Sequence, residues 1–200
     1  MREIDGALVN AWRRGDESGT QALFNAIYPY AVRVGALSGL TVDDARECAQ
    51  DAFTHAYERR MQLRDVQAFA LWFHRILTHS ILDQLTKRQR LRITPLGDEG
   101  KLAEDWQRNA PLQPDEVALE AERSDELWRQ VQTLAPRARL AITLRYYSDL
   151  STREVAEALR ISEGAARTLL SRALAQLRQS QTRDPRLVQE IQRETGPVAR

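Results

Sequence analysis

The stretch LSTREVAEALRISEGAARTLLSRALAQLR, residues 150–178, decides the fold. Ser151 can cap a helix, and Glu154 three residues later completes a capping box. The pattern breaks at residues 160–162, where Ser162 can cap a second helix. A helix, a short turn and a second helix form the geometry that places a recognition helix in the major groove. The stretch therefore predicts a helix-turn-helix, with a purely structural helical hairpin as the alternative.

The second helix of this hairpin carries polar side chains that are candidates for DNA contact. The positions expected to face outward are Glu163, Ala166, Arg167, Ser171 and Arg178. Arg167 and Ser171 lie one turn apart, and both residue types can bond base edges or phosphates. The preceding residues, 134–150, predict another helix that packs on the hairpin through Leu140, Ile142, Leu144 and Tyr147.

Helical periodicity also dominates the N-terminal half of the chain. Apolar residues recur every three or four positions over residues 20–37. A second helix is expected to begin near Thr41, because Asp43 and Asp44 follow where the helix dipole favours acids. A third is expected over about 66–92. No convincing period-two strand pattern occurs, so the sequence predicts an all-α fold.

The amino-acid composition changes in the middle of the chain and separates two helical parts. Residues 94–119 are rich in proline, glycine and acidic side chains, which is typical of a flexible linker. We therefore expect two small helical domains, at 1–93 and 120–179, joined by this acidic linker. Residues 180–200 form a C-terminal tail of unknown role.

The net charge of +1 is low for a nucleic-acid-binding protein. The net charge differs between segments of the chain: it is −5 over residues 94–123, +2 over 1–93 and +3 over 124–179. The acidic middle segment therefore offsets two mildly basic ones. Phosphate neutralisation supplies most non-specific DNA binding, so mild basicity predicts modest intrinsic affinity. The chain is expected to bind DNA well only with help from a larger partner.

Several function classes are disfavoured. The single cysteine, Cys48, cannot form an internal disulfide or a multi-cysteine zinc site. His74 and His79 are five residues apart and do not share a helix face. No glycine-rich phosphate loop, apolar run of membrane-spanning length or secretion signal is present. We expect a cytoplasmic protein without membrane insertion, metal, cofactor or enzymatic activity.

Two helices of the N-terminal half are candidates for binding. An acidic edge on the second helix, whose ordinary interpretation is a solvated face, consists of Asp43, Asp44, Glu47 and Asp51. The third helix combines aromatic with basic residues: Trp72, Phe73, His74, Arg75, His79, Lys87, Arg88, Arg90 and Arg92. Aromatic rings beside cations suit melted DNA, although cations at a helix C-terminus also complement its dipole.

Taken in order, these parts resemble the extracytoplasmic-function (ECF) group of bacterial sigma factors. ARECAQDAFTHAY, residues 45–57, is similar to the family's region 2.2. AFALWFHRILTHSILDQLTKRQR, residues 68–90, is similar to its aromatic and basic helix, and residues 134–178 are similar to region 4. The resemblance covers roughly residues 8–93 and 120–179.

The resemblance implies a role for each part. The acidic helix would dock on the β′ clamp helices of core RNA polymerase through Asp44, Glu47, Gln50 and Asp51. Residues 59–69 would capture a flipped base of the −10 element, and that DNA would be lined by Arg64, Phe69, Trp72, Arg75, His79, Asp83, Lys87 and Arg88. Region 4 would bind the β flap and read the −35 element through Ser162, Glu163, Arg167, Ser171 and Arg172. The acidic linker would run towards the RNA exit channel, and an anti-sigma factor is a further implied partner.

Three positions depart from the family pattern. His79 stands where asparagine is frequent, Arg160 stands at the usual glycine of the turn, and Leu169 stands where a recognition-helix cation is expected. These departures bear on which promoter is read. The main alternative is a one-component regulator that binds duplex DNA through the helix-turn-helix and dimerises through its N-terminal helices. An all-helical enzyme and an interaction bundle without a DNA role are weaker alternatives.

Overall fold

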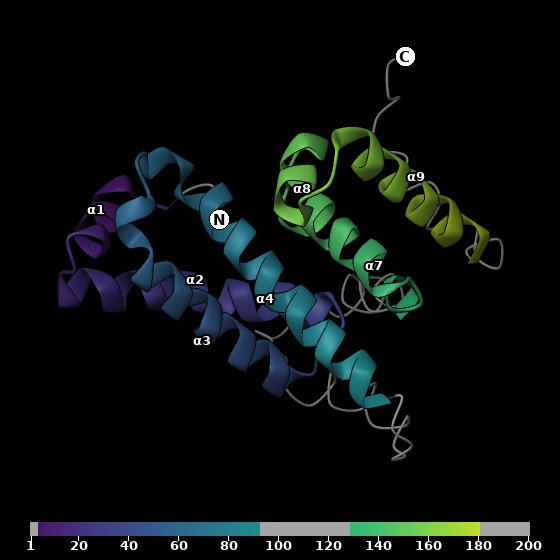
Figure 1. Ribbon diagram of the computed structural model, residues 1–200, viewed down its shortest axis with the longest axis horizontal. Helices are drawn as coiled ribbons and strands as arrows, with labels where there is room; N and C mark the ends of the chain where they lie inside the picture. The colour runs from purple at the N-terminus through teal and green to yellow at the C-terminus, as the bar shows by residue number, and fades with distance from the viewer. Residues whose placement is uncertain (1–3, 93–128, 181–200) are drawn as a thin grey trace, which may run out of the picture.

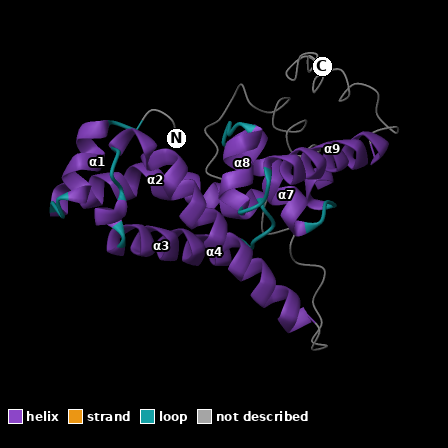
Figure 2. Ribbon diagram, turned by 45° about the horizontal axis from the view of Figure 1, so that its top comes forward, coloured by secondary structure: helices purple, strands orange, loops and turns teal. Residues whose placement is uncertain are grey.

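A computed structural model describes residues 4–92 and 129–180, and within these ranges every regular element is helical (Figures 1 and 2). The first unit contains α1 (Gly6–Arg13), α2 (Glu17–Leu37), α3 (Val42–Glu58), the 3₁₀ turns η1 (Arg60–Gln62) and η2 (Val66–Ala68), and α4 (Phe69–Arg92). The second unit contains α7 (Pro136–Ile142), the π-helical turn η3 (Thr143–Tyr147), α8 (Thr152–Leu159) and α9 (Glu163–Ser180). The predicted all-α class is confirmed. The predicted linker, 94–119, lies outside the described residues, as does the tail beyond residue 180.

Side-chain caps fix where the helices begin. Thr41 Oγ1 accepts a hydrogen bond from the Asp44 amide at 3.2 Å, as the sequence predicts. Asp16 caps α2 in the same way through the Gly19 amide, at 2.6 Å. A cap supplies a partner for an amide that the first helical turn leaves unsatisfied. The short helix α1 is absent from the sequence predictions, because eight residues give too little periodicity to detect.

The predicted apolar faces of α2 and α3 form the core of the first unit. Leu23, Ile27 and Val34 of α2 are buried, as are the small residues Ala45, Cys48, Ala49, Ala52 and Ala56 of α3. Small side chains let helices approach closely. A Cβ atom on Gly35 would lie only 3.1 Å from the Ala45 Cβ atom, so α2 and α3 approach each other closely at these two residues.

The second unit contains the predicted helix-turn-helix. Ser151 and Glu154 make the reciprocal bonds of a capping box, at 3.2 and 2.7 Å. Arg160 ends α8 in the left-handed region, with φ of 53°, where glycine is normally favoured. One prediction is wrong: Ala166, expected to face outward, is fully buried.

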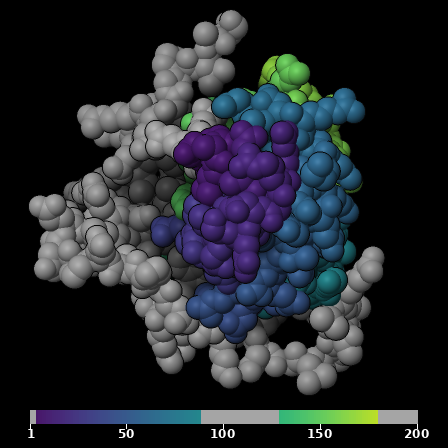
Figure 3. Space-filling view, turned by 90° about the vertical axis from the view of Figure 1, so that its left-hand side faces the viewer, coloured from purple at the N-terminus to yellow at the C-terminus, as the bar shows by residue number. Residues whose placement is uncertain are grey.

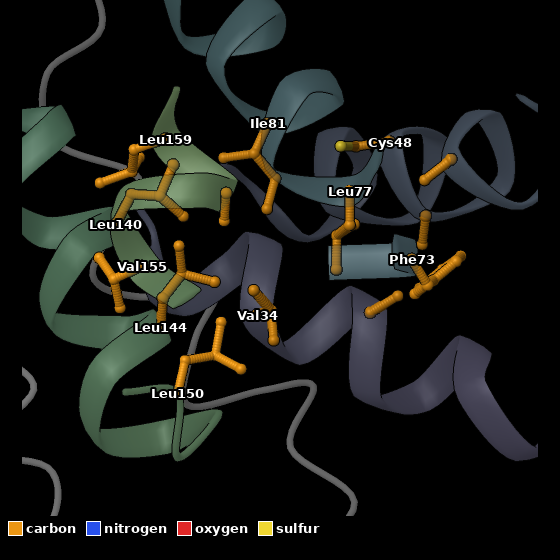
Figure 4. Packing of buried hydrophobic residues seen from close by; sticks show 14 of the residues in the cluster. Val34, Cys48, Phe73, Leu77, Ile81, Leu140, Leu144, Leu150, Val155 and Leu159 are labelled. Atoms are coloured by element: carbon orange, nitrogen blue, oxygen red, sulfur yellow. The ribbon is translucent and has the colours of Figure 1, made fainter. Parts of the chain in front are cut away.

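The two units pack directly against each other. Figure 4 shows Val34 of α2 and Ile81 of α4 beside the leucines of the second unit, and all of them belong to one apolar cluster. Tyr30 of α2 stacks on Tyr147 of η3, with ring centroids 5.7 Å apart and planes 14° apart. Gln132 donates a hydrogen bond to the Leu37 carbonyl oxygen at 3.3 Å. The described parts of the expected domains therefore share a core in this conformation.

Candidate functional site

An acidic face lies exposed along α3. Glu47, Gln50 and Asp51 are exposed, whereas Asp44 is partly buried and forms an ion pair with Arg88 of α4 at 2.9 Å. The buried Cys48 thiol behind this face has its pKa raised to about 12, first by burial and then by the nearby carboxylates. The helix thus presents negative charge outward, on a rigid element anchored by its alanine-rich buried side.

The long helix α4 carries a polar stripe at four-residue spacing. Arg75, His79 and Asp83 are exposed on one side of it, and Lys87 continues the stripe. His79 Nδ1 lies 3.1 Å from Asp83 Oδ2. Arg75 forms an ion pair with Glu157 of α8, so part of the stripe faces the helix-turn-helix unit. Figure 1 shows α8 lying against the middle of α4.

Phe69, which the sequence analysis expected to line the −10 DNA, is buried in this structure. It is only 2% exposed, and its ring packs edge-on to Trp12 of α1 with centroids 5.4 Å apart. Trp72 is partly exposed and packs against the same tryptophan, at 6.1 Å. Phe69 and Trp72, at the start of α4, therefore hold α1 in place. Of these two rings, only that of Trp72 is exposed enough to stack on a base. The cover supplied by Trp12 was not predicted from the sequence.

Residues 59–69, expected to form the base-capturing segment, are held in place by α1. Arg13 Nη1 donates to the Leu63 carbonyl oxygen at 3.2 Å. Asp65 accepts a hydrogen bond from the Gln67 amide at 2.9 Å and so caps η2. Arg64 is exposed beside these contacts. Sequence reasoning missed Arg13, because no local pattern connects residues 50 positions apart.

The recognition helix α9 lies in the second unit, apart from α1–α3 (Figures 1 and 2), and carries exposed polar side chains. Ser162 caps it through the Ala165 amide at 3.2 Å. The predicted contact residues that follow are all exposed: Glu163, Arg167, Ser171 and Arg172. Arg167 pairs with Glu163 at 3.1 Å, and a Cβ atom on Gly164 would meet nothing within 4 Å. The start of α9 is thus open enough for a close approach of DNA.

The described residues hold neither a metal-ligand cluster nor a membrane-spanning helix. No group of three histidine, cysteine, aspartate or glutamate side chains within residues 4–92 and 129–180 could hold a metal ion. His74 instead lies buried, with Nδ1 bonded to the Ala70 carbonyl oxygen at 2.6 Å and Nε2 to the Tyr30 hydroxyl at 2.8 Å. In the same ranges no helix is long and apolar enough to cross a membrane.

Comparison with known families matches both units. Sigma-70 region 2 matches residues 23–91, and Sigma-70 region 4 matches residues 124–177. The two matches occur in the family's order and together span more than half of the chain. The chain belongs to the sigma-70 family, in its extracytoplasmic-function group. The one-component regulator considered from the sequence is therefore excluded.

This sigma factor is similar in sequence to several curated relatives. It is 28% identical to the ECF RNA polymerase sigma factor SigW of Bacillus subtilis, over 72% of this chain and 78% of the relative. It is 27% identical to the ECF RNA polymerase sigma-E factor of Escherichia coli, over 84% of this chain and 90% of the relative. SigM of Mycobacterium tuberculosis is also 27% identical, over 86% of this chain and 82% of the relative.

Two solved structures share the fold of this sigma factor. CnrH, in complex with the cytosolic domain of CnrY, superposes with a TM-score of 0.59 at 19% identity, covering 90% of this chain and 98% of CnrH. RpoE of Bartonella quintana, in complex with the anti-sigma factor NepR, gives a TM-score of 0.60 at 18% identity, covering 83% of this chain and 98% of RpoE. The arrangement of helices is thus shared with proteins of very different sequence.

Proposed function

We propose that this sigma factor binds core RNA polymerase and directs it to promoters. Its first unit binds the polymerase and the −10 element, and its second unit binds the β flap and the −35 element. The observation that carries the proposal is that one chain combines an exposed acidic face on α3 with an open recognition helix, α9. An acidic face repels DNA, so it suits a basic protein surface, whereas the polar surface of α9 suits a groove. The proposed working units are residues 1–93 and 120–179.

Core polymerase is the proposed partner of α3. Glu47, Gln50 and Asp51 are exposed and can meet the β′ clamp helices without rearrangement. Asp44 joins them at the edge of the face, where its ion pair with Arg88 links the polymerase-binding helix to the end of α4. Charge complementarity of this kind sets orientation and association rate more than affinity.

The first unit is also proposed to bind the −10 element. Side chains of α4 and of the loop between η1 and η2 serve this role: Arg64, Trp72, Arg75, His79, Asp83, Lys87 and Arg88. Exposed cations on α4 can contact phosphates, and Trp72 offers a stacking surface for an unpaired base. Phe69 acts beneath them by holding α1 against α4.

The second unit is proposed to bind the β flap and to read the −35 element through α9. The residues for DNA contact are Ser162, Glu163, Arg167, Ser171 and Arg172. Arginine at this position can bond guanine edges bidentately or contact phosphate, and serine can bond either. Leu169 stands where the family often has a cation. This leucine is partly buried against the apolar core, which fits a role in packing.

An anti-sigma factor is a further proposed partner, since both structural relatives were solved as complexes with a second protein. A polymerase subunit acts where DNA and polymerase are, so we expect the protein to work in the cytoplasm. We also expect no cofactor and no catalytic activity of its own.

The decisive test is run-off transcription with purified core polymerase on a library of promoter fragments. Start sites that depend on the added protein are expected, whereas core polymerase alone serves as the control. In parallel, duplex promoter binding is measured with and without core, and tight binding is expected only for the assembled holoenzyme. If no start site depends on the protein, the proposed function is wrong.

A further inference from the structure

His79 and Asp83 form a close pair on the exposed side of α4. Nδ1 of His79 lies 3.1 Å from Oδ2 of Asp83, one helical turn further along, and 55% and 59% of the two side chains are exposed. Figure 3 shows α4 and the segment that leads into it (blue to teal) along one side of the first unit, beside α1 (purple). The pair therefore lies at the surface, in the middle of the stripe that is proposed to meet the −10 element.

The carboxylate of Asp83 decides which imidazole nitrogen of His79 carries the proton. A neutral histidine has one N–H donor and one nitrogen with a lone pair, whereas a carboxylate can only accept. Two lone pairs 3.1 Å apart would repel each other, so the proton stays on Nδ1, where it faces Asp83. The lone pair is then on Nε2, on the far side of the ring from the carboxylate. The pair thus presents a hydrogen-bond acceptor of fixed polarity.

The cations of the same stripe suit a different part of the DNA. Arg75 and Lys87, one turn to either side of the pair, have only N–H donors and carry a positive charge. Donors of this kind contact phosphates, which position a protein on DNA, whereas contacts to base edges specify the sequence. A neutral imidazole acceptor gains little from a phosphate, because both groups are acceptors. Within the stripe, His79 is therefore the residue suited to a base edge.

We propose that His79 reads one base of the −10 element by accepting a hydrogen bond at Nε2, and that Asp83 is the positioning residue that fixes this polarity. The inference rests on the proposed function and adds the class of base that the site selects. In the major groove, adenine N6 and cytosine N4 are amino donors, whereas thymine O4 and guanine O6 and N7 are acceptors. The pair therefore favours adenine or cytosine on the contacted strand over thymine or guanine.

An amide at position 79 would select bases differently. Asparagine, which is frequent in the family at this position, has both a donor and an acceptor and bonds adenine at N6 and N7 together. Cytosine offers an amino donor in the major groove but no acceptor beside it, so an amide favours adenine alone. His79 uses only its acceptor and treats the two amino bases alike. The histidine thus widens the choice at one position of the promoter from one base to two.

The test uses holoenzyme and duplex fragments of a promoter found by run-off transcription. Each base pair of the −10 element is replaced in turn by the other three, and affinity is measured by competition at low temperature, which keeps the strands paired. A slightly alkaline buffer keeps an ordinary imidazole neutral. At one position, fragments with adenine or cytosine on one strand are expected to bind about three- to tenfold more tightly than those with thymine or guanine, the range of one net hydrogen bond. This amino-to-keto ratio is the quantity that the variants must change.

Four variants separate base reading from general effects of charge. His79→Ala should bring the amino-to-keto ratio to about one, and His79→Asn should keep the preference for adenine but lose that for cytosine. Asp83→Ala leaves the imidazole free to take either tautomer, so the ratio should fall towards one although His79 is intact. The loss of negative charge raises affinity for every fragment, and the ratio cancels that effect. Lys87→Gln is the control on the same stripe: it should weaken binding of every fragment alike and leave the ratio unchanged.

The outcomes that would overturn the inference are distinct from failure of the proposed function. If no position of the −10 element prefers amino over keto bases, or if the preference survives His79→Ala, then His79 does not read a base through its acceptor. A ratio that Asp83→Ala leaves at the wild-type value would overturn the positioning role of Asp83. If holoenzyme binds no fragment more tightly than core polymerase alone does, the proposed function itself is wrong, and the reading of a base with it.

Discussion

Arg75 of α4 forms an ion pair with Glu157 of α8, which lies 82 residues further along the chain. The pair joins the helix proposed to line the −10 DNA to the helix-turn-helix proposed to bind the −35 element. Two elements about 25 base pairs apart are separated by roughly 85 Å along B-form DNA. Two units in side-chain contact cannot span that distance, so we expect this contact to open when a promoter is bound.

The first prediction concerns this contact. Glu157→Gln removes its charge and is expected to shift the equilibrium between packed and separated units about two- to fivefold towards separation, since one partly exposed ion pair contributes up to about 1 kcal/mol. The measurement is energy transfer between dyes placed on the two units of the free protein. Asp43→Asn breaks an ion pair within α3 and should leave the transfer efficiency unchanged.

A charge swap gives the stricter form of this test. Arg75→Glu alone should separate the units as Glu157→Gln does, and combining it with Glu157→Arg should restore their packing. Additive effects of the two substitutions would mean that the side chains do not act as a pair.

The second prediction concerns the acidic face of α3. Reversing the charges of Glu47 and Asp51 to lysine should weaken core polymerase binding at least about tenfold, because facing like charges cost several kcal/mol. The fold should survive, since both side chains are exposed. Glu58→Lys is the control, as it reverses a charge on the same helix about 10 Å beyond Asp51 and about 16 Å beyond Glu47. Affinity for core is measured by competition, and helicity by circular dichroism. Unchanged affinity in the double variant would contradict the assignment.

The third prediction concerns the turn of the helix-turn-helix. Arg160 adopts φ of 53°, which strains a side chain with a Cβ atom. Arg160→Gly is expected to raise the free energy of unfolding by up to about 1 kcal/mol, because relief of this strain exceeds the added entropy of the unfolded chain. Arg160→Ala keeps the Cβ atom and should not give this gain. Urea denaturation measures both variants, and an equal gain in the two would point to the removed charge instead.

The fourth prediction concerns alkaline pH. Burial raises the pKa values of Cys48 and Tyr30 to about 12, from reference values of 9.0 and 10.0. Each folded pKa lies above its unfolded value, so the stabilisation is complete below pH 9 and is lost as the pH rises towards 12. Urea denaturation at a series of pH values should therefore show stability falling above pH 9. Cys48→Ala should fall less steeply than wild type, and parallel curves would contradict the assigned cause.

The sequence predicted which helix faces are exposed at the candidate site, but not which side chains another helix covers. Exposure of the acidic edge of α3 and of the polar side chains on α9 follows from helical periodicity and from where apolar residues stop. The burial of Phe69 and of Ala166 was not predicted, for a reason common to both. Periodicity gives the angle at which a side chain leaves its helix, whereas burial depends on what another element places over it, here Trp12 for Phe69.

What the sequence determined by itself is local: the helical class, the caps at Thr41 and Ser151, and the turn before Ser162. These features follow from hydrogen bonds and spacings within a few residues. Tertiary structure alone decided the packing of the two units, the pairing of Arg75 with Glu157 and the gathering of arginines from α1 and the segment 59–69. Contacts between distant residues depend on how whole helix faces fit together, and no short stretch of sequence contains that information.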